Sequence, residues 1–207
     1  MSTEYTPRYR TSWALVIGIN AYQHASPLSY ACNDADAVAD VLVNDLRFPQ
    51  DQVILLKDQK ATKEAILDAY LGFAKQASDP DDRVLVFFAG HGTTRPGLHG
   101  DIGYLVPVDG DPDHLSSLVR WDELTRNAEL IPAKHILFIM DACYSGLAVS
   151  RAIPPGTKRF LSDMLQRPAR QAIAAGKADQ VVADSGGGPG GHTKAHRTGA
   201  WADGLAC

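Results

Sequence analysis

The sequence predicts an α/β fold with a mainly parallel central sheet and helices on both faces. Two apolar runs, 83–90 and 135–142, have the length and the β-branched and aromatic content of fully buried parallel strands. Strand-like runs alternate along the chain with segments whose apolar residues recur at helical spacing, which implies right-handed crossovers. At 207 residues the chain can form one well-buried domain, and a second domain would be cramped.

The first part of the chain is expected to form two strands and two helices. In order, they are a strand over 13–19, a helix over about 33–46, a strand over 52–56 and a helix over 62–77. Asn33 or Asp34 is expected to cap the first helix, and Thr62 opens the second.

The second part continues the alternation. The expected elements are a strand over 83–90, a short strand over 103–108 within a small hairpin, a helix around 121–130, a strand over 135–142 and a further strand over 180–183. A glycine-rich loop and the first turns of a helix follow that strand, so the domain is expected to be truncated. The organisation is therefore an extension over 1–12, a core over 13–150, a connector over 151–179 and a final segment over 180–207.

Composition excludes several classes of protein. A formal net charge of -4 argues against nucleic acid as the main partner. The longest apolar runs stop at about eight residues, far short of a membrane span, and the polar N-terminus lacks a signal core. Cys32, Cys143 and Cys207 form neither a disulfide framework nor a zinc pattern, so a reducing cytoplasm is expected, with no metal site.

Both buried runs end in a side chain that can carry chemistry. The run 83–90 leads into His91, which lies between Gly90 and Gly92, and the run 135–142 leads into Cys143. Ligands bind at the carboxyl ends of parallel strands in open α/β sheets. If the two strands are neighbours, an imidazole and a thiol emerge together, which is the minimal apparatus for nucleophilic acyl transfer.

The motifs resemble those of the caspase-like cysteine peptidases, and most closely their prokaryotic and metacaspase-type branch. The resemblance covers nearly the whole chain, and its motifs occur in the family's order. They are ALVIGINAY at 14–22, NDA at 33–35, FFAGHG at 87–92, GYLVPVD at 103–109, DACYSG at 141–146, and TGA with GL at 198–205. The resemblance implies a caspase-like three-layer sandwich.

It also implies a role for particular residues. His91 and Cys143 would form a catalytic dyad that hydrolyses peptide bonds through a thioester acyl-enzyme, and the backbone N–H groups of Gly92 and Cys143 would bind the oxyanion. Asp141, two places before the cysteine, and Asp34 would line the P1 pocket. Two carboxylates there would reject an acidic P1 residue and favour Arg, then Lys.

The basic connector is a candidate for self-processing. A peptidase specific for basic P1 residues could cleave its own exposed connector. The candidate sites are Arg151, Lys158, Arg159, Arg167 and Arg170. A solvated helix face is the alternative interpretation of this segment.

The remaining expectations concern partners and alternatives. Protein or peptide substrates with a basic P1 residue are expected, an upstream activator or sensor is left open, and the chain is expected to be a monomer. No cofactor is expected; calcium activates part of the metacaspase group and is left open, although 109–113 lacks the spacing of a calcium loop.

The alternatives are a catalytically silent caspase-like binding or regulatory module, or one fragment of a processed enzyme. A nucleotide-binding domain is disfavoured, because the sequence lacks a phosphate loop. An amidase would share the dyad and differ in its substrate.

Overall fold

A five-stranded parallel sheet forms the centre of the computed structural model, which describes residues 8–98, 102–142 and 169–174. Its strand order is β2-β1-β3-β7-β8. The strands are β1 (Ser12–Gly18), β2 (Val53–Lys57), β3 (Arg83–Gly90), β7 (His135–Ala142) and β8 (Ala169–Ala174). Since β1, β3 and β7 are adjacent and parallel, their carboxyl ends meet at one edge of the sheet.

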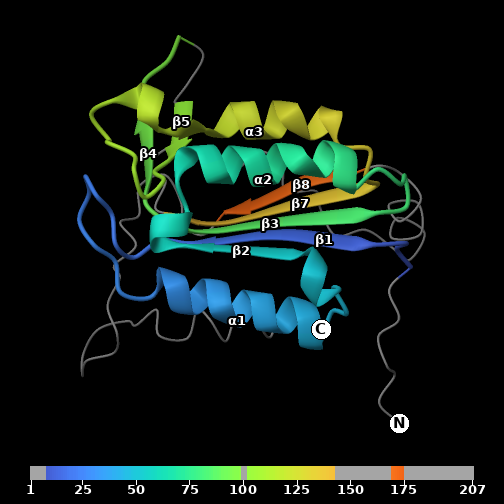
Figure 1. Cartoon of the computed structure of the whole chain (residues 1–207). Coiled ribbons are helices and arrows are strands. Elements are labelled where there is room, and N and C mark those ends of the chain that lie inside the picture. Colours follow the sequence, from blue (N-terminus) through green and yellow to red (C-terminus); the bar gives the residue numbers. More distant parts are fainter. Residues whose placement is uncertain (1–7, 99–101, 143–168, 175–207) are drawn as a thin grey trace, which may run out of the picture.

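Helices cover both faces of this sheet, as the sequence predicts. Helix α1 (Ala31–Asn44) lies on one face, while α2 (Lys63–Gln76) and α3 (Trp121–Asn127) lie on the other (Figure 1). Short 3-10 helices occupy several connections: η1 (Gln50–Gln52), η2 (Asp58–Lys60), η3 (Leu115–Ser117) and η4 (Ala128–Leu130). The predicted three-layer α/β sandwich is confirmed.

The alternation of side chains along the central strands supplies two cores. In β3, Val86 and Phe88 pack against α2 and the segment after it, whereas Leu85 and Phe87 pack against α1. Successive side chains of a strand point to opposite faces, so a strand covered on both sides must be apolar throughout. This is why β3 and β7 read as continuous apolar runs and why their bounds match the predicted 83–90 and 135–142.

A small antiparallel sheet follows β3 directly. It contains β4 (Gly92–Arg95), β5 (Ile102–Leu105) and β6 (Val119–Arg120), in that order. The predicted hairpin around 103–108 is therefore confirmed, with β4 and β5 as its two strands. Because β4 begins one residue after His91, the hairpin fixes the main chain on that side of the histidine.

The start of α1 differs from the prediction. The helix begins at Ala31 with Tyr30 as its N-cap residue, so neither Asn33 nor Asp34 is the cap. Instead, the N–H of Asp34 donates to the Tyr30 carbonyl within the first turn, at 2.9 Å. The prediction for α2 is confirmed, because Thr62 caps it by accepting a hydrogen bond from the N–H of Ala65 at 3.2 Å.

The connector also differs from the prediction. Strand β8, Ala169–Ala174, lies inside the range 151–179 and pairs in parallel with β7. The otherwise unpaired edge of β7 favours a strand here, because an unpaired edge offers free N–H and C=O groups to a further strand. The predicted strand at 180–183 and the helix start after 198 lie outside the described residues.

Candidate active site

The register between β3 and β7 aligns the strand ends that precede the two residues of the predicted dyad. Gly90 pairs with Ala142, and these are the last residues of the two strands. His91 and Cys143 are therefore the next residue along each of two adjacent parallel strands. Cys143 itself lies outside the described residues, so only the histidine side of the dyad is seen in atomic detail.

The main chain of His91 is held on both sides. Its N–H donates to the hydroxyl oxygen of Tyr22 at 2.7 Å, and its carbonyl accepts from the N–H of Val106 at 3.0 Å. The Val106 contact belongs to the β4–β5 hairpin, whereas Tyr22 comes from the loop after β1. Two separate segments thus fix the backbone from which the imidazole projects.

The imidazole contacts the same loop. Its Nε2 lies 2.8 Å from the carbonyl oxygen of Ser26 and 3.4 Å from the Ser26 hydroxyl. A carbonyl oxygen can only accept, so Nε2 carries the proton in this contact. In the neutral ring the lone pair is then on Nδ1, which makes Nδ1 the basic nitrogen.

The loop that carries Tyr22 is anchored by a carboxylate. Asp58, the first residue after β2, accepts hydrogen bonds through Oδ1 from the N–H groups of Asn20 at 2.7 Å and Ala21 at 2.8 Å. Burial acts to raise the pKa of Asp58, but the N–H groups of Ala21 and Asn20, together with Cys32 and Lys57, hold the pKa below its usual value. Further along the loop, the N–H of Gln23 donates to the carbonyl of Val108 at 2.9 Å.

The thiol of Cys32 lies near the carboxyl end of β1, and its surroundings suit packing. Cys32, in the first turn of α1, directs its Sγ to the carbonyl of Gly18 at 3.3 Å. Burial and the neighbouring Asp58 raise the pKa of Cys32. A thiol with a raised pKa is a poor nucleophile, so these surroundings suit a packing residue at the helix start.

The predicted P1 carboxylates belong to two elements on one face of the sheet. Asp141 is in β7, in register with Ala89, and its side chain points to the same face as that of Ile139 two residues earlier. Ile139 packs on the α1 side of the sheet. Asp34 lies in the first turn of α1, which covers that face.

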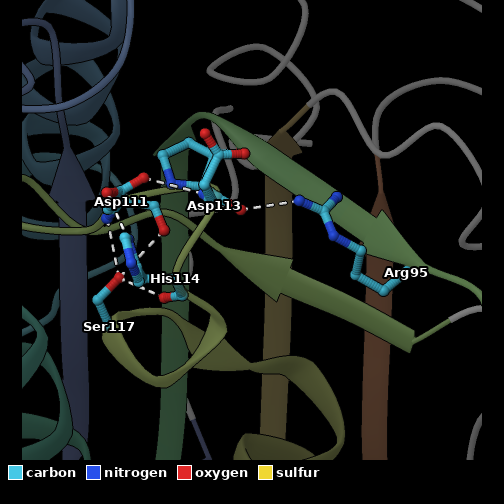
Figure 2. A network of polar contacts seen from close by, with 6 residues as sticks. Arg95, Asp111, Asp113, His114 and Ser117 are labelled. Carbon is cyan, nitrogen blue, oxygen red and sulfur yellow. Dashed lines mark hydrogen bonds and ion pairs between the residues drawn. The ribbon is translucent and has the colours of Figure 1, made fainter.

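The acidic loop after β5 forms hydrogen bonds within itself that satisfy the carboxylate of Asp111. Asp111 accepts from the N–H of Asp113 at 2.9 Å and from Nδ1 of His114 at 2.7 Å, and both contacts lower its pKa. Ser117 accepts from the N–H of Asp111 at 2.8 Å, and Arg95 donates to the carbonyl of Pro112 at 2.8 Å (Figure 2). Within the described part of the chain no three acidic, histidine or cysteine side chains form a cation site.

The candidate processing sites fall into two groups. Arg151, Lys158, Arg159 and Arg167 lie outside the described residues. Arg170 is in β8, in register with Ile136 of β7. Cleavage after Arg170 would require β8 to leave the sheet, which makes it the weakest of the five candidates.

Three contributors to the site were not predicted from the sequence. They are Tyr22 and Ser26, which contact His91, and Asp58, which anchors their loop. The sequence did carry a signal for Asp58, because it is an acidic residue close to the end of a predicted strand. Tyr22 and Ser26 lie in a loop of polar and small residues, and only the folded loop brings them to the histidine.

Comparisons with known proteins agree with this architecture. The family model described as the caspase domain, of peptidase family C14, matches residues 11–198. The metacaspase-1A of Aspergillus oryzae is 32% identical over 178 residues, which are 77% of this chain and 41% of that protein. The metacaspase-1 of Emericella nidulans is 28% identical over 188 residues, which are 84% of this chain and 46% of that protein.

A solved structure shares the fold. The crystal structure of a protein from Geobacter sulfurreducens superposes with a TM-score of 0.53 at 24% identity, covering 66% of this chain and 52% of that one. The chain spans less than half the length of the two metacaspases. No helix of the described residues is long and apolar enough to cross a membrane. On the match of the caspase-domain model to most of its length, this chain belongs to the caspase family.

Proposed function

We propose that this chain is a cysteine endopeptidase that hydrolyses peptide bonds after Arg, and less readily after Lys. The observation that carries the proposal is the register of β3 and β7. Gly90 and Ala142 pair at the ends of these adjacent strands, and His91 and Cys143 are the next residues of the sequence. Membership of the caspase family supports the reaction class. The substrates would be proteins or peptides with a basic P1 residue.

The proposed chemistry uses the basic nitrogen of His91. Nδ1 takes the proton of the Cys143 thiol, and the thiolate attacks the peptide carbonyl to form a C–S bond. The imidazolium then gives its proton to the leaving amine as the C–N bond breaks, leaving a thioester. Water, deprotonated by His91, hydrolyses the thioester and releases the acid and the thiol.

The proposed oxyanion site draws on the main chain of Gly92. The hydrogen bond from the N–H of Val106 to the carbonyl of His91 makes Gly92 and Leu105 a non-hydrogen-bonded pair of the β4–β5 ladder. The N–H of Gly92 therefore points away from β5, which supports its use as a donor to the oxyanion. The N–H of Cys143 is proposed as the second donor.

The proposed preference for Arg rests on charge. Asp34 and Asp141 belong to elements on the same face of the sheet, at its carboxyl end. Two carboxylates attract a cationic P1 side chain and repel an acidic one, and a planar guanidinium can pair with them through several N–H donors at once.

Fluorogenic peptides that end in Arg, Lys or Asp test both parts of the proposal. We expect cleavage after Arg and Lys, none after Asp, and none at all in a Cys143→Ala control. Loss of one acidic residue in Asp141→Asn should reduce kcat/KM for the Arg peptide by at least about tenfold. Cleavage after Asp would overturn the pocket and spare the dyad, and wild-type protein without cleavage would favour a binding module.

Self-processing is a separate proposal. We propose cleavage in the basic connector, after Arg151, Lys158, Arg159 or Arg167. Incubated wild-type protein should yield new termini at one of these residues, identified by mass spectrometry, while Cys143→Ala stays intact. The same fragments from both proteins would show a contaminating protease.

A further inference from the structure

We propose that Tyr22 is a positioning residue for His91, with its hydroxyl holding the histidine backbone and its ring supporting the imidazole. The inference rests on the proposed function, because it assigns Tyr22 a role in the dyad chemistry. It adds a contributor from a loop that supplies no reacting atom.

The first contact is the hydroxyl. The N–H of His91 donates to the Tyr22 oxygen at 2.7 Å, a short distance for this type of bond. His91 follows the last residue of β3. The ladder between β1 and β3 ends at the pair of Gly18 and Ala89, so His91 has no paired residue in β1. The tyrosine oxygen takes the place of that partner and sets the direction in which the main chain leaves the sheet.

Gly90 makes room for this hydroxyl. A Cβ on residue 90 would lie 2.5 Å from the Tyr22 oxygen and 3.0 Å from two ring carbons of Phe88. A real Cβ cannot approach an oxygen so closely, so any larger residue at position 90 would displace Tyr22. The glycine before the histidine is thus explained by a specific neighbour.

The second contact is between the two rings. The centroids of the Tyr22 phenol and the His91 imidazole are 4.8 Å apart, with an interplanar angle of 42°. With Nε2 held by the Ser26 carbonyl at 2.8 Å, the phenol limits rotation of the imidazole about its side-chain bonds. An imidazole confined in this way holds Nδ1 in one direction, which lowers the cost of orientation in the proposed reaction.

Tyr22 is itself well fixed and stays neutral. Its loop is anchored by Asp58 through Asn20 and Ala21, and by the bond from Gln23 to Val108. Burial raises the pKa of Tyr22 far above its usual value, and this outweighs the hydrogen bond from His91, which lowers it. The hydroxyl therefore remains a neutral acceptor at every pH at which the dyad would work.

The test compares three variants of the full 207-residue chain. Tyr22→Phe removes only the hydroxyl, and Tyr22→Leu removes the ring as well. Tyr70→Phe is the matched control, because it deletes a buried tyrosine hydroxyl that donates to the Leu124 carbonyl at 2.6 Å, between α2 and α3. Each is assayed for kcat and KM on the Arg peptide, and for the rate at which iodoacetamide alkylates Cys143 as a function of pH.

We expect Tyr22→Phe to lower kcat by about tenfold with KM within about twofold, and Tyr22→Leu to lower kcat by about 100-fold. The midpoint of the alkylation profile should move up in both, because a disordered imidazolium stabilises the thiolate less well. Tyr70→Phe should lower the melting temperature and leave kcat and the profile unchanged. Equal kinetics of Tyr22→Phe and wild type would overturn the proposal, as would an equal loss in Tyr70→Phe.

A double-mutant cycle gives an independent readout. Gly90→Ala should cost activity in wild type because the new methyl group displaces the hydroxyl, and should cost less in Tyr22→Phe, where the hydroxyl is gone. The contact with Phe88 is common to both backgrounds and cancels. Additive losses would contradict the assigned contact.

Failure of the proposed function gives a different pattern. If His91→Ala leaves both cleavage and Cys143 alkylation at wild-type rates, the dyad is wrong. If His91→Ala abolishes cleavage and slows alkylation but Tyr22→Phe does neither, only the role of Tyr22 is wrong.

Discussion

The imidazole of His91 is oriented by neutral groups, namely the Ser26 carbonyl and the Tyr22 phenol. A carbonyl fixes the tautomer by accepting from Nε2, and it stabilises the imidazolium by the same bond. The carboxylate of Asp58 does not contact the imidazole. It holds the loop that carries Tyr22 and Ser26. Single-residue tests can therefore separate the chemistry of the histidine from the stability of its loop.

Asp58→Asn should destabilise the protein in a pH-dependent way. Replacing a carboxylate that accepts two main-chain N–H bonds should lower the free energy of unfolding by about 1–2 kcal/mol at pH 7. The folded-state pKa of Asp58 is lowered, so its contribution is fully present above the unfolded value of about 3.9 and is lost as the pH falls through the folded value. The difference between wild type and variant should thus shrink below about pH 4.

Urea unfolding at a series of pH values measures this difference. Asp36→Asn is the control, since Asp36 pairs with Lys57 at 2.8 Å on the surface, where an ion pair contributes at most about 1 kcal/mol. A pH-independent difference for Asp58→Asn would contradict the assigned role of its charge.

At the scale of elements, the position of α1 depends on a close approach to the end of β1. A Cβ on Gly18 would lie 2.5 Å from the Ala31 carbonyl oxygen and 2.6 Å from the Ala35 Cβ. Only glycine lets the first turn of α1 lie so close to the strand. That turn carries Asp34, so the approach of helix to strand also positions one of the proposed pocket carboxylates.

Gly18→Ala should therefore weaken both folding and recognition of Arg. Because the opposing atom is main-chain, α1 must shift, at a cost of about 2–3 kcal/mol in the free energy of unfolding. Gly72→Ala is the matched control: its Cβ would lie 3.4 Å from the end of the Gln76 side chain, and alanine in a helix should stabilise by about 0.5–1 kcal/mol. Chemical denaturation distinguishes them, and a stable Gly18→Ala protein would contradict the packing argument.

At the scale of the whole molecule, polar contacts join the strands at the amino end of the sheet, whereas the candidate active site lies at its carboxyl end. At the amino end, buried Asp82 accepts from the N–H of Thr11 at 2.9 Å, and Arg83 donates to the Ser12 hydroxyl and the Leu46 carbonyl, both at 2.8 Å. These bonds tie the starts of β1 and β3 together. The carboxyl end carries His91 and Tyr22, and the proposed chemistry belongs to this end of the sheet.

Burial of the central strands explains how far the sequence could be interpreted. The strands 83–90 and 135–142 were predictable to the residue, because a strand buried on both faces must be apolar until it ends. The cap of α1 was predicted wrongly, because the docking on Gly18 draws the helix start to Ala31, ahead of the polar residues that favour a cap. Strand β8 lay within the predicted connector, because its sequence, ARQAIA, is neither a continuous apolar run nor a regular alternation.

Part of the site was beyond sequence reasoning for a physical reason. His91 and Gly92, the proposed oxyanion donor, follow directly after the end of β3, where motif and topology coincide. Tyr22 and Ser26 reach His91 only because the loop after β1 folds back onto the β3 end, held by Asp58 and Val108. Contacts between two loops leave no periodic pattern in a sequence.

The central claim is that Cys143 is a nucleophile activated by His91 and directed at basic residues. The most direct test incubates the protein with an arginine chloromethyl ketone and identifies the modified residue by peptide mapping. We predict one label per chain, on Cys143, strongly reduced in His91→Ala, with no labelling by the aspartate analogue. Labelling of Cys32 instead of Cys143, labelling unaffected by His91→Ala, or faster labelling by the aspartate analogue would contradict the account.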